Sequence, residues 1–346
     1  MADYKPIDYA EYPALFHSFG SYKTVVQNRS VNTVSDYLSD LRLFFRYLRM
    51  SRENLPAEQF SKIDISCVDL AYAGSVKKSE IYEFLNFMTE HGKNHAGARA
   101  RKLSAIKAFY KYLTVATGQL SENPARDIEG PKIKQALPKF LSYEESLSLL
   151  QTVQNDTKSK TCLRDYTMIT LFLNCGMRLS ELVGISLSDI DPALRSMRVV
   201  QGDSLRVLGK GNKVRIIYLN DACRQSLTLY LQQRQSLQSS KENRKALFLS
   251  SRGQRISPKT VQWVVYKYLD AAGFSNRKLS VHKLRHTAAT LMYQSGQVDV
   301  RVLKEILGHE QLNTTQIYTH VSNEQLQRAM QANPLADAGA NPPKKQ

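Results

Sequence analysis

Six residues in the second half of the chain carry side chains that could together perform a reaction on a phosphodiester. In chain order they are Arg178, Lys210, His282, Arg285, His309 and Tyr318. Arginine and lysine can neutralise a phosphate, histidine can hydrogen-bond it or move a proton, and tyrosine can attack phosphorus as a nucleophile. Tyr318 lies nine positions after His309 and 33 after Arg285. This combination predicts a covalent reaction that needs no metal ion.

The sequence HKLRH places His282 and Arg285 three positions apart, so on a helix both side chains project from one face. His282 and His286, four positions apart, could instead hold a metal ion. The zinc-protease motif has glutamate where Lys283 stands, and the cations beside the histidines oppose binding of a divalent ion. We therefore favour a phosphate as the ligand and expect no metal or cofactor.

The segment LGHEQLNTTQIYTHV contains the tyrosine. Gly308 can end the preceding helix and let His309 leave at a sharp angle. Taken alone, Tyr318 is better explained as a tyrosine packed in a small core, and Lys210 in GKGNKVR as a solvated turn lysine. Together with Arg178 in CGMRLSEL, the set favours a phosphate site.

The composition agrees with an anionic polymer as partner. The chain has 48 lysines and arginines against 31 aspartates and glutamates, a net charge of +17, and its pI is about 9.6. A basic surface that is merely solvated gives the same excess, but a pI this high is typical of nucleic-acid-binding domains. Charge therefore indicates the class of partner and not the reaction.

The length of 346 residues exceeds the ~100–200 residues usual for one domain. From Ser121 to Ser142 the sequence has three prolines at intervals of seven, which favour an extended linker. We therefore expect a first domain, a linker, a second domain and a mobile tail, at residues 1–120, 121–141, 142–332 and 333–346.

The start of the chain, MADYKPIDYAEYP, has neither the basic start nor the apolar run of a signal peptide. Its four cysteines are far apart in the sequence and form no CxxC pair, which fits reduced and mostly buried thiols. These features predict a soluble, cytoplasmic protein.

In the first domain, apolar residues recur at three- and four-residue spacing in Ser30–Leu48, Ser79–His91 and Gly97–Leu113, which predicts amphipathic helices. Asn32 or Thr33 could cap the first of them. The aromatic stripes are expected to form the core. The third helix also carries basic residues that either form a solvated face or contact DNA phosphates: Arg99, Arg101, Lys102 and Lys107.

In the second domain the same patterns predict further helices and short strands. We expect strands at Met197–Val200, Ser204–Leu208 and Val214–Leu219, with a hairpin turn at residues 209–212 between the last two. The predicted helices are Arg164–Asn174, Ser180–Ile185, Ala222–Gln233, Pro258–Ala272, Val281–Gln294, Val300–Leu307 and Asn323–Ala332.

The order Arg, Lys, His-x-x-Arg, His, Tyr resembles that of the tyrosine site-specific recombinases of the phage-integrase superfamily, in particular the Xer-type or short transposon-integrase branch. The resemblance covers residues from Ser30 to Ala332. It implies a two-domain DNA clamp, with an all-helical core-binding domain and a mainly α catalytic domain that carries a small antiparallel sheet.

The resemblance also implies a role for each residue. Tyr318 attacks the scissile phosphate and forms a 3′-phosphotyrosyl link, which retains the bond energy so that religation needs neither ATP nor metal. Arg178 and Arg285 stabilise the pentacoordinate state, and Lys210 protonates the leaving oxygen. His282 is the candidate base and His309 hydrogen-bonds the phosphate. Glu181 could support an arginine.

One spacing departs from the Xer pattern, because Arg178 and Lys210 are 32 residues apart, longer than the usual compact form. An extended hairpin would absorb the difference, and Lys213 is the alternative to Lys210. The implied partners are duplex DNA with paired inverted half-sites and a second recombinase subunit, with a dimer on each site and a tetramer in the synapse. The rival functions are a type IB topoisomerase and a non-catalytic DNA-binding protein.

Overall fold

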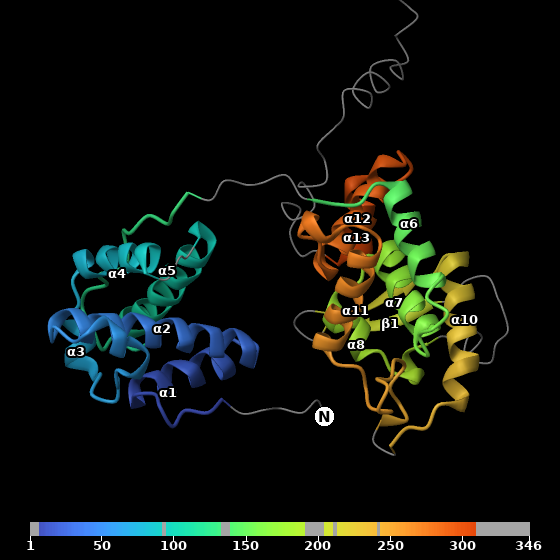
Figure 1. Cartoon of the computed structure of the whole chain (residues 1–346). Coiled ribbons are helices and arrows are strands. Elements are labelled where there is room, and N and C mark those ends of the chain that lie inside the picture. Colours follow the sequence, from blue (N-terminus) through green and yellow to red (C-terminus); the bar gives the residue numbers. More distant parts are fainter. Residues whose placement is uncertain are drawn as a thin grey trace, which may run out of the picture. The chain divides into compact units, whose positions relative to one another are not determined.

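Helices dominate the part of the chain described by the computed structural model, which comprises residues 7–91, 95–132, 139–190, 204–209, 213–240 and 243–308. The chain divides into two units, residues 1–135 and 136–346, and the described part of each has its own hydrophobic core. Within these residues a two-stranded antiparallel sheet accompanies the helices of the second unit (Figure 1). The mainly helical class with a small antiparallel sheet is therefore confirmed.

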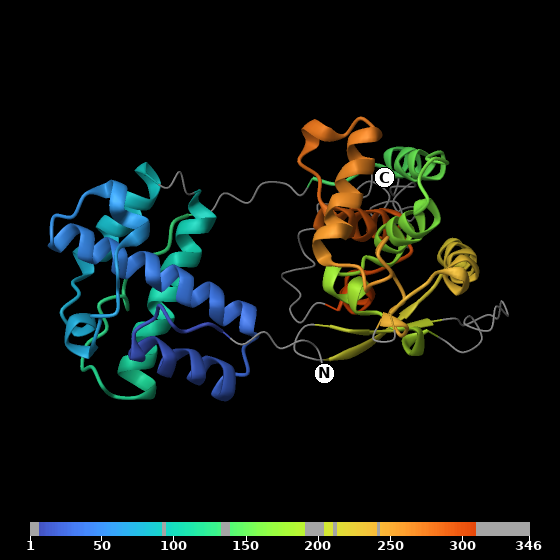
Figure 2. The same ribbon diagram turned by 60° about the horizontal axis from the view of Figure 1, so that its bottom comes forward.

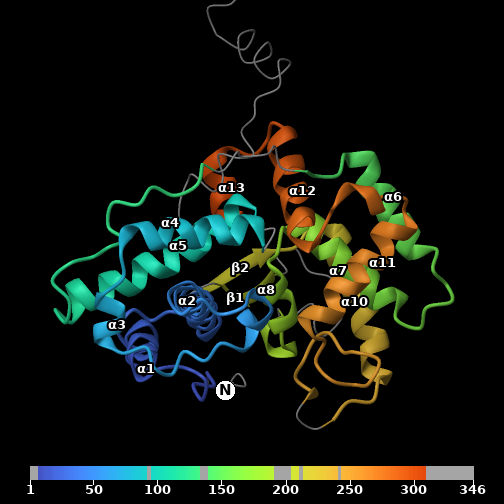
Figure 3. The ribbon, with the colours of Figure 1, turned by 60° about the vertical axis from the view of Figure 1, so that its left-hand side comes forward.

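The first unit is a set of helices packed around aromatic side chains. The helices are α1 (Ala14–Ser21), α2 (Val31–Arg52), α3 (Leu70–Gly74), α4 (Lys78–Glu90) and α5 (Ala96–Lys111), and α5 continues into a π-helical turn, Tyr112–Ala116. Helix α2 packs against α4 and α5 (Figure 3). The rings of Phe16, Phe45 and Phe109 meet with centroids 5.3 to 5.9 Å apart. The predicted aromatic stripes thus form the core.

Two details of the first unit differ from the sequence-based expectations. The cap of α2 is Ser30, whose Oγ accepts a hydrogen bond from the backbone N–H of Thr33 at 3.3 Å, because the helix begins at Val31 and Asn32 is already inside it. The unit also continues beyond residue 120, where the sequence placed its end. Ala125 and Ile128 are buried in its core, so this part of the proline-bearing stretch packs on the helices.

The second unit surrounds one central helix, α7. Its helices are α6 (Tyr143–Gln154), α7 (Cys162–Cys175), α8 (Leu179–Gly184), α10 (Asp221–Ser236), α11 (Pro258–Ala271), α12 (Val281–Gln294) and α13 (Val300–Leu307). Helices α6, α10 and α12 all pack on α7, which explains why α7 is buried on nearly every side (Figure 1). The predicted helix Asn323–Ala332 and the tail lie outside the described residues.

The sheet is a hairpin of β1 (Ser204–Leu208) and β2 (Val214–Tyr218) (Figure 2). Its register pairs Leu205 with Ile217 and Val207 with Arg215. The backbone N–H of Gly209 donates to the carbonyl of Lys213 at 2.8 Å, which closes the ladder at the turn. The two strands are confirmed, whereas the predicted strand Met197–Val200 and residues 210–212 of the turn lie outside the described residues.

All four cysteines are free, but they differ in burial. Cys67 is exposed, Cys162 is half-buried, and Cys175 and Cys223 are buried with their Sγ atoms 3.6 Å apart. The expectation of mostly buried thiols is therefore right for Cys175 and Cys223 and wrong for Cys67. In the described part of the chain, no helix combines the length and the apolar character needed to cross a bilayer.

Candidate active site

Arg178 follows the central helix α7 after two residues, and the turn between them depends on Gly176. Gly176 ends α7 in the left-handed region with φ of +58°, and a Cβ there would come within 2.8 Å of Leu307. The chain then turns so that Arg178 precedes the first residue of α8. Its backbone N–H and its Nη1 each donate to Glu181 at 2.7 Å. The expectation that Glu181 supports an arginine is thus confirmed.

Glu181 is completely buried and shared by two arginines. Arg178 contacts it from α8, and Arg215 contacts it from β2 with Nη2 2.9 Å from Oε2. Burial raises the pKa of the Glu181 carboxyl, but the hydrogen bonds and charges of Arg215 and Arg178 outweigh burial, and the net pKa lies below its ordinary value. Glu181 is therefore a buried carboxylate that fixes the directions of two guanidinium groups.

Helix α12 supplies His282 and Arg285 on one face, as the spacing predicts. Arg285 is 2% exposed, and it donates from Nη1 to the carbonyl of Gly176 and from Nη2 to that of Leu307, each at 2.6 Å. Burial lowers the pKa of the His282 imidazole below its ordinary 6.5, and the charges of Arg285, Lys283 and Arg178 lower it further. The lowered pKa favours the neutral imidazole of His282, which is the form that can accept a proton.

Arg178, His282 and Arg285 line the same cavity, of about 580 Å³. Its wall also includes Gln262 and Tyr266 from α11, which the sequence did not single out. The sequence indicated only that these two residues lie four positions apart, and therefore on one face of a predicted helix. Residues that merely pack in a core show the same spacing. The structure thus brings together three of the six candidate residues, from the α7–α8 junction and from α12.

The C-terminus of α13 meets three arginines. Arg215 donates to the carbonyl of Ile306, Arg285 to that of Leu307, and Arg178 to that of Gly308 at 2.5 Å. These carbonyls have no partner within their helix, and positive charge is favourable at this end of the helix dipole. Gly308 ends the helix with φ of +62°, as predicted, and its carbonyl accepts a hydrogen bond from Arg178, which lines the cavity.

Lys210, His309 and Tyr318 lie outside the described residues, but the residues that precede the first two, Gly209 and Gly308, are described and lie close to Arg178. A Cβ on Gly209 would lie 3.7 Å from Glu181 Oε1 and 3.9 Å from Arg178 Nη1. A Cβ on Gly308 would lie 3.5 Å from the same Nη1. The residues that directly precede Lys210 and His309 are therefore both neighbours of Arg178.

The four basic residues expected to contact DNA from α5 occupy different environments. Arg99 donates to Thr89 Oγ1 at 2.7 Å, and Arg101 is half exposed with its Nη1 2.5 Å from Asp40. Lys102 does not lie on a solvated face, because its side chain is buried and its Nζ is 3.4 Å from Asp40. Burial raises the pKa of the Asp40 carboxyl, and the two cations partly offset the effect of burial. Lys102 therefore has an internal role here.

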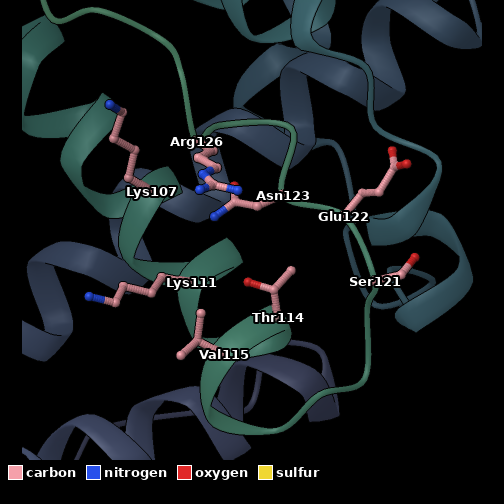
Figure 4. A pocket seen from close by; sticks show the side chains of 8 residues that line it. All are labelled: Lys107, Lys111, Thr114, Val115, Ser121, Glu122, Asn123 and Arg126. Atoms are coloured by element: carbon pink, nitrogen blue, oxygen red, sulfur yellow. The ribbon is translucent and has the colours of Figure 1, made fainter.

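Lys107, by contrast, borders a basic hollow of about 770 Å³ at the end of α5. Figure 4 shows Lys107 and Lys111 on one side of it and Asn123 and Arg126 on the other, with the carboxylate of Glu122 turned away from both lysines. Three cations line the hollow: Lys107, Lys111 and Arg126. Within the described residues, no ion pair neutralises any of them, whereas three arginines of the same unit, Arg42, Arg49 and Arg52, are paired with glutamates. The hollow is thus suited to an anion.

Comparison with known proteins identifies both units. Residues 139–325 match the model of the "Phage integrase family", and residues 17–116 match that of the "Phage integrase, N-terminal SAM-like domain". A tyrosine recombinase XerC of Caldanaerobacter subterraneus is 45% identical over 94% of this chain and 88% of its own length. XerC proteins of Thermodesulfovibrio yellowstonii and Myxococcus xanthus are 34% and 35% identical over 86% and 91% of this chain, and over 88% and 95% of their own lengths.

Solved structures share the fold. A XerH site-specific recombinase bound to palindromic difH substrate, in a post-cleavage complex, matches with a TM-score of 0.65 and 21% identity over 92% of this chain and 94% of that chain. A lambda integrase dimer bound to a core site matches with a TM-score of 0.57 and 19% identity over 86% and 96%. The two family matches and the identity to the XerC proteins lead to one conclusion. The chain belongs to the phage integrase family and is a tyrosine recombinase.

Proposed function

We propose that the protein recombines duplex DNA at specific sites by tyrosine transesterification at the cavity formed by Arg178, His282 and Arg285. The observation that carries this assignment is the convergence of those three side chains, from separate segments, on one cavity of about 580 Å³. Each is of a type that binds phosphate or moves a proton. The nucleophile of this reaction is Tyr318.

The chemical step exchanges one phosphodiester for another. The Tyr318 oxygen forms a bond to the scissile phosphorus, and the bond from phosphorus to the deoxyribose 5′ oxygen breaks. His282 accepts the phenol proton, and Lys210 gives a proton to the leaving 5′ oxygen. The product is a 3′-phosphotyrosyl link, and the reverse attack by a 5′ hydroxyl rejoins the strand. Because the link keeps the energy of the original bond, neither ATP nor a metal ion is needed.

Arg178 and Arg285 stabilise the additional negative charge of the pentacoordinate phosphorus. Both guanidiniums are held by hydrogen bonds to Glu181 or to backbone carbonyls, so their orientation is set before DNA binds. Donors that need no reorganisation are the most effective at stabilising charge that develops in a transition state. His309 adds a hydrogen bond to the same phosphate.

The first unit contributes contacts to the DNA backbone through the basic hollow. Its three unneutralised cations, Lys107, Lys111 and Arg126, surround a space that takes a phosphodiester group. Lys111 also acts on Lys23, whose pKa is lowered by burial first and then by the charges of Arg29 and Lys111. The positive potential therefore extends beyond the hollow. Arg99 and Arg101 are further backbone contacts, and Lys102 shares Asp40 with Arg101 and so helps to place it.

The substrate is duplex DNA with paired inverted half-sites, bound by a dimer at each site and by a tetramer when two sites recombine. Four strand exchanges between two duplexes require four tyrosines, and the lambda integrase structure with the same fold is a dimer on its core site. We favour resolution of chromosome dimers over movement of a genetic element, because the three relatives compared above are XerC recombinases. That role places the protein in the cytoplasm.

Trapping on a nicked suicide substrate tests the proposed function. A nick beside the scissile phosphate lets a short fragment diffuse away after cleavage, so the covalent complex accumulates. We expect a protein–DNA band on a denaturing gel, formed in EDTA without ATP, and mapping of the DNA-linked peptide to Tyr318. Binding to the site without any covalent band would contradict catalysis, and a link to another residue would reject Tyr318.

The pH dependence of cleavage should report the lowered pKa of His282. Because only neutral imidazole accepts a proton, the rate falls as pH drops through that pKa, and the midpoint of this acid limb should lie below 6.5. Replacing Lys283 by glutamine removes a nearby positive charge and should raise the midpoint. Single-turnover cleavage measured across the pH range checks both statements. A midpoint above 6.5, or one that Lys283→Gln leaves in place, would argue against His282 as the base.

The basic hollow should contribute to the salt dependence of DNA binding. Each phosphate contact changes the slope of log K against log salt by about 0.9, so the combined replacement of Lys107, Lys111 and Arg126 by alanine should reduce the slope by about 2 to 3. Fluorescence anisotropy with a labelled site at several salt concentrations measures this slope. The control is Lys62→Ala, which changes an exposed lysine of the same unit that does not line the hollow, and it should change the slope little. Equal slopes for the triple variant and the unsubstituted protein would show that the hollow does not bind DNA phosphates.

A further inference from the structure

Arg215 occupies a particular place on the hairpin. It is paired with Val207 across the two strands, and the next pair, Leu208 with Val214, directly precedes the turn. Val207 is buried and the Arg215 side chain is 15% exposed, whereas Leu208 and Val214 are exposed on the other face. Arg215 is therefore the residue of β2 nearest to the turn that points into the unit.

The guanidinium of Arg215 joins three segments. Its Nε and Nη2 donate to the two carboxylate oxygens of Glu181 at 3.2 and 2.9 Å, and its Nη1 donates to the carbonyl of Ile306 at the end of α13. Glu181 in turn holds the backbone N–H and the Nη1 of Arg178. A two-point contact between arginine and a carboxylate fixes the relative orientation of the groups, which a single contact does not.

Neutralising Glu181 does not by itself require Arg215. Arg178 already forms an ion pair with the same carboxylate at 2.7 Å, and a second guanidinium leaves this group of side chains with a net positive charge. What Arg215 adds is the connection between β2 and α8. Its loss would leave the hairpin end next to Gly209 without this tether to Glu181 and the α13 carbonyl.

We propose that Arg215 is a positioning residue for the cleavage step, because it ties the described end of the hairpin, which precedes Lys210 in the chain, to Glu181 and through Glu181 to Arg178. The proposal rests on the general-acid role proposed above for Lys210. Gly209, the residue before this lysine, already lies beside Glu181 and Arg178. A general acid must come within hydrogen-bond reach of the leaving oxygen, and a misplacement of about 1 Å can cost on the order of a hundredfold in rate.

A change of leaving group separates this role from a general loss of structure. In a substrate whose 5′-bridging oxygen is replaced by sulfur, attack by Tyr318 breaks the phosphorus–sulfur bond and the sulfur departs as a thiolate. Thiols ionise near pH 8.5, far more readily than alcohols, so this leaving group needs no proton from a general acid. Misplacing Lys210 should therefore slow cleavage of the oxygen substrate alone.

The experiment measures single-turnover cleavage of matched oxygen and sulfur suicide substrates at saturating protein. The variants are Arg215→Met and Arg215→Lys, of which the second keeps the charge and loses the two-point contact, together with Lys210→Ala. On the oxygen substrate we expect both Arg215 variants to be slower by about a hundredfold, and on the sulfur substrate by no more than about threefold. The control Arg206→Met removes an exposed arginine from β1 and should leave both rates unchanged.

The outcomes distinguish this inference from the function on which it rests. If Lys210→Ala cleaves the sulfur substrate normally and the Arg215 variants do not, Arg215 does not act through the lysine and the inference is wrong. If the Arg215 variants cleave the oxygen substrate at the normal rate, the inference is wrong. If Lys210→Ala is slow on both substrates, the general-acid role of Lys210 is rejected. Thermal unfolding of each variant verifies that the protein compared is folded, and Arg215→Lys supplies the comparison if Arg215→Met does not fold.

Discussion

Replacement of Tyr318 by phenylalanine is expected to abolish the covalent protein–DNA complex while leaving DNA affinity within about twofold, because the change removes one oxygen atom and no positive charge, and phosphate contacts supply most of the affinity. A phenylalanine ring has no atom that can form the phosphotyrosyl bond, so the loss should be complete and not partial. Denaturing gels with the nicked substrate measure the covalent product, and a mobility shift on the same DNA measures binding.

The matched control for this prediction is Tyr293→Phe. Tyr293 lies in α12, packed against the small cluster around Leu303 and Leu307, and it does not line the cavity. This variant should form the covalent complex at the normal rate, which would show that removing a phenol oxygen from another tyrosine of the second unit is harmless in itself. A covalent band from Tyr318→Phe would show that another residue is the nucleophile.

The second large effect is expected at Arg285. Lysine in its place cannot reach the carbonyls of both Gly176 and Leu307, and it cannot present two parallel donors to a phosphate. We expect Arg285→Lys to lower the single-turnover cleavage rate by at least about a hundredfold, the usual cost of losing one preorganised donor to a transition state. Each buried carbonyl left without a donor would also destabilise the fold by about 1–3 kcal/mol.

The variant Arg164→Lys distinguishes a loss of cleavage rate from a loss of stability. Arg164 is also a buried arginine, and it donates to Asp165 and to the carbonyl of Leu249 at 2.8 Å, but it does not line the cavity. This variant should lower the thermal midpoint as Arg285→Lys does, yet the protein that remains folded should cleave at a rate close to normal. Comparable losses of cleavage in the two variants, measured below their unfolding transitions, would attribute the Arg285 effect to stability alone.

Much of the helical framework could be predicted from the sequence because the pattern and the end signals agree. Helix α12 runs from Val281 to Gln294 and α13 from Val300 to Leu307, both as predicted, and Gly308 marks the end of α13 by its left-handed backbone. The grouping of His282 with Arg285 followed from their spacing on one helix. That Arg178 lies in the same site as these two residues was predicted from the family resemblance, because no local sequence pattern relates the start of α8 to α12.

The features that could not be predicted depend on contacts between distant residues or on short segments. Helix α1, whose N-cap residue Pro13 supplies no side-chain cap, and the five-residue helix α3 were not predicted. Helix α6 had a usable signal, the capping box of Ser142 and Glu145, which lay at the end of the stretch interpreted as a linker. The burial of Lys102 depends on Asp40, 62 positions earlier, and no property of α5 alone indicates that pairing.

The arginines around the end of α13 also have a consequence for the thermodynamics of DNA binding. A free arginine side chain loses rotational entropy worth about 1.5–2 kcal/mol at room temperature when it is immobilised. In Arg178 and Arg285 much of that loss has already occurred during folding, because Glu181 and the carbonyls of Gly176, Leu307 and Gly308 hold both guanidiniums. The scissile phosphate therefore meets donors that are already ordered, and more of the binding free energy remains available for aligning the DNA strand with the nucleophile.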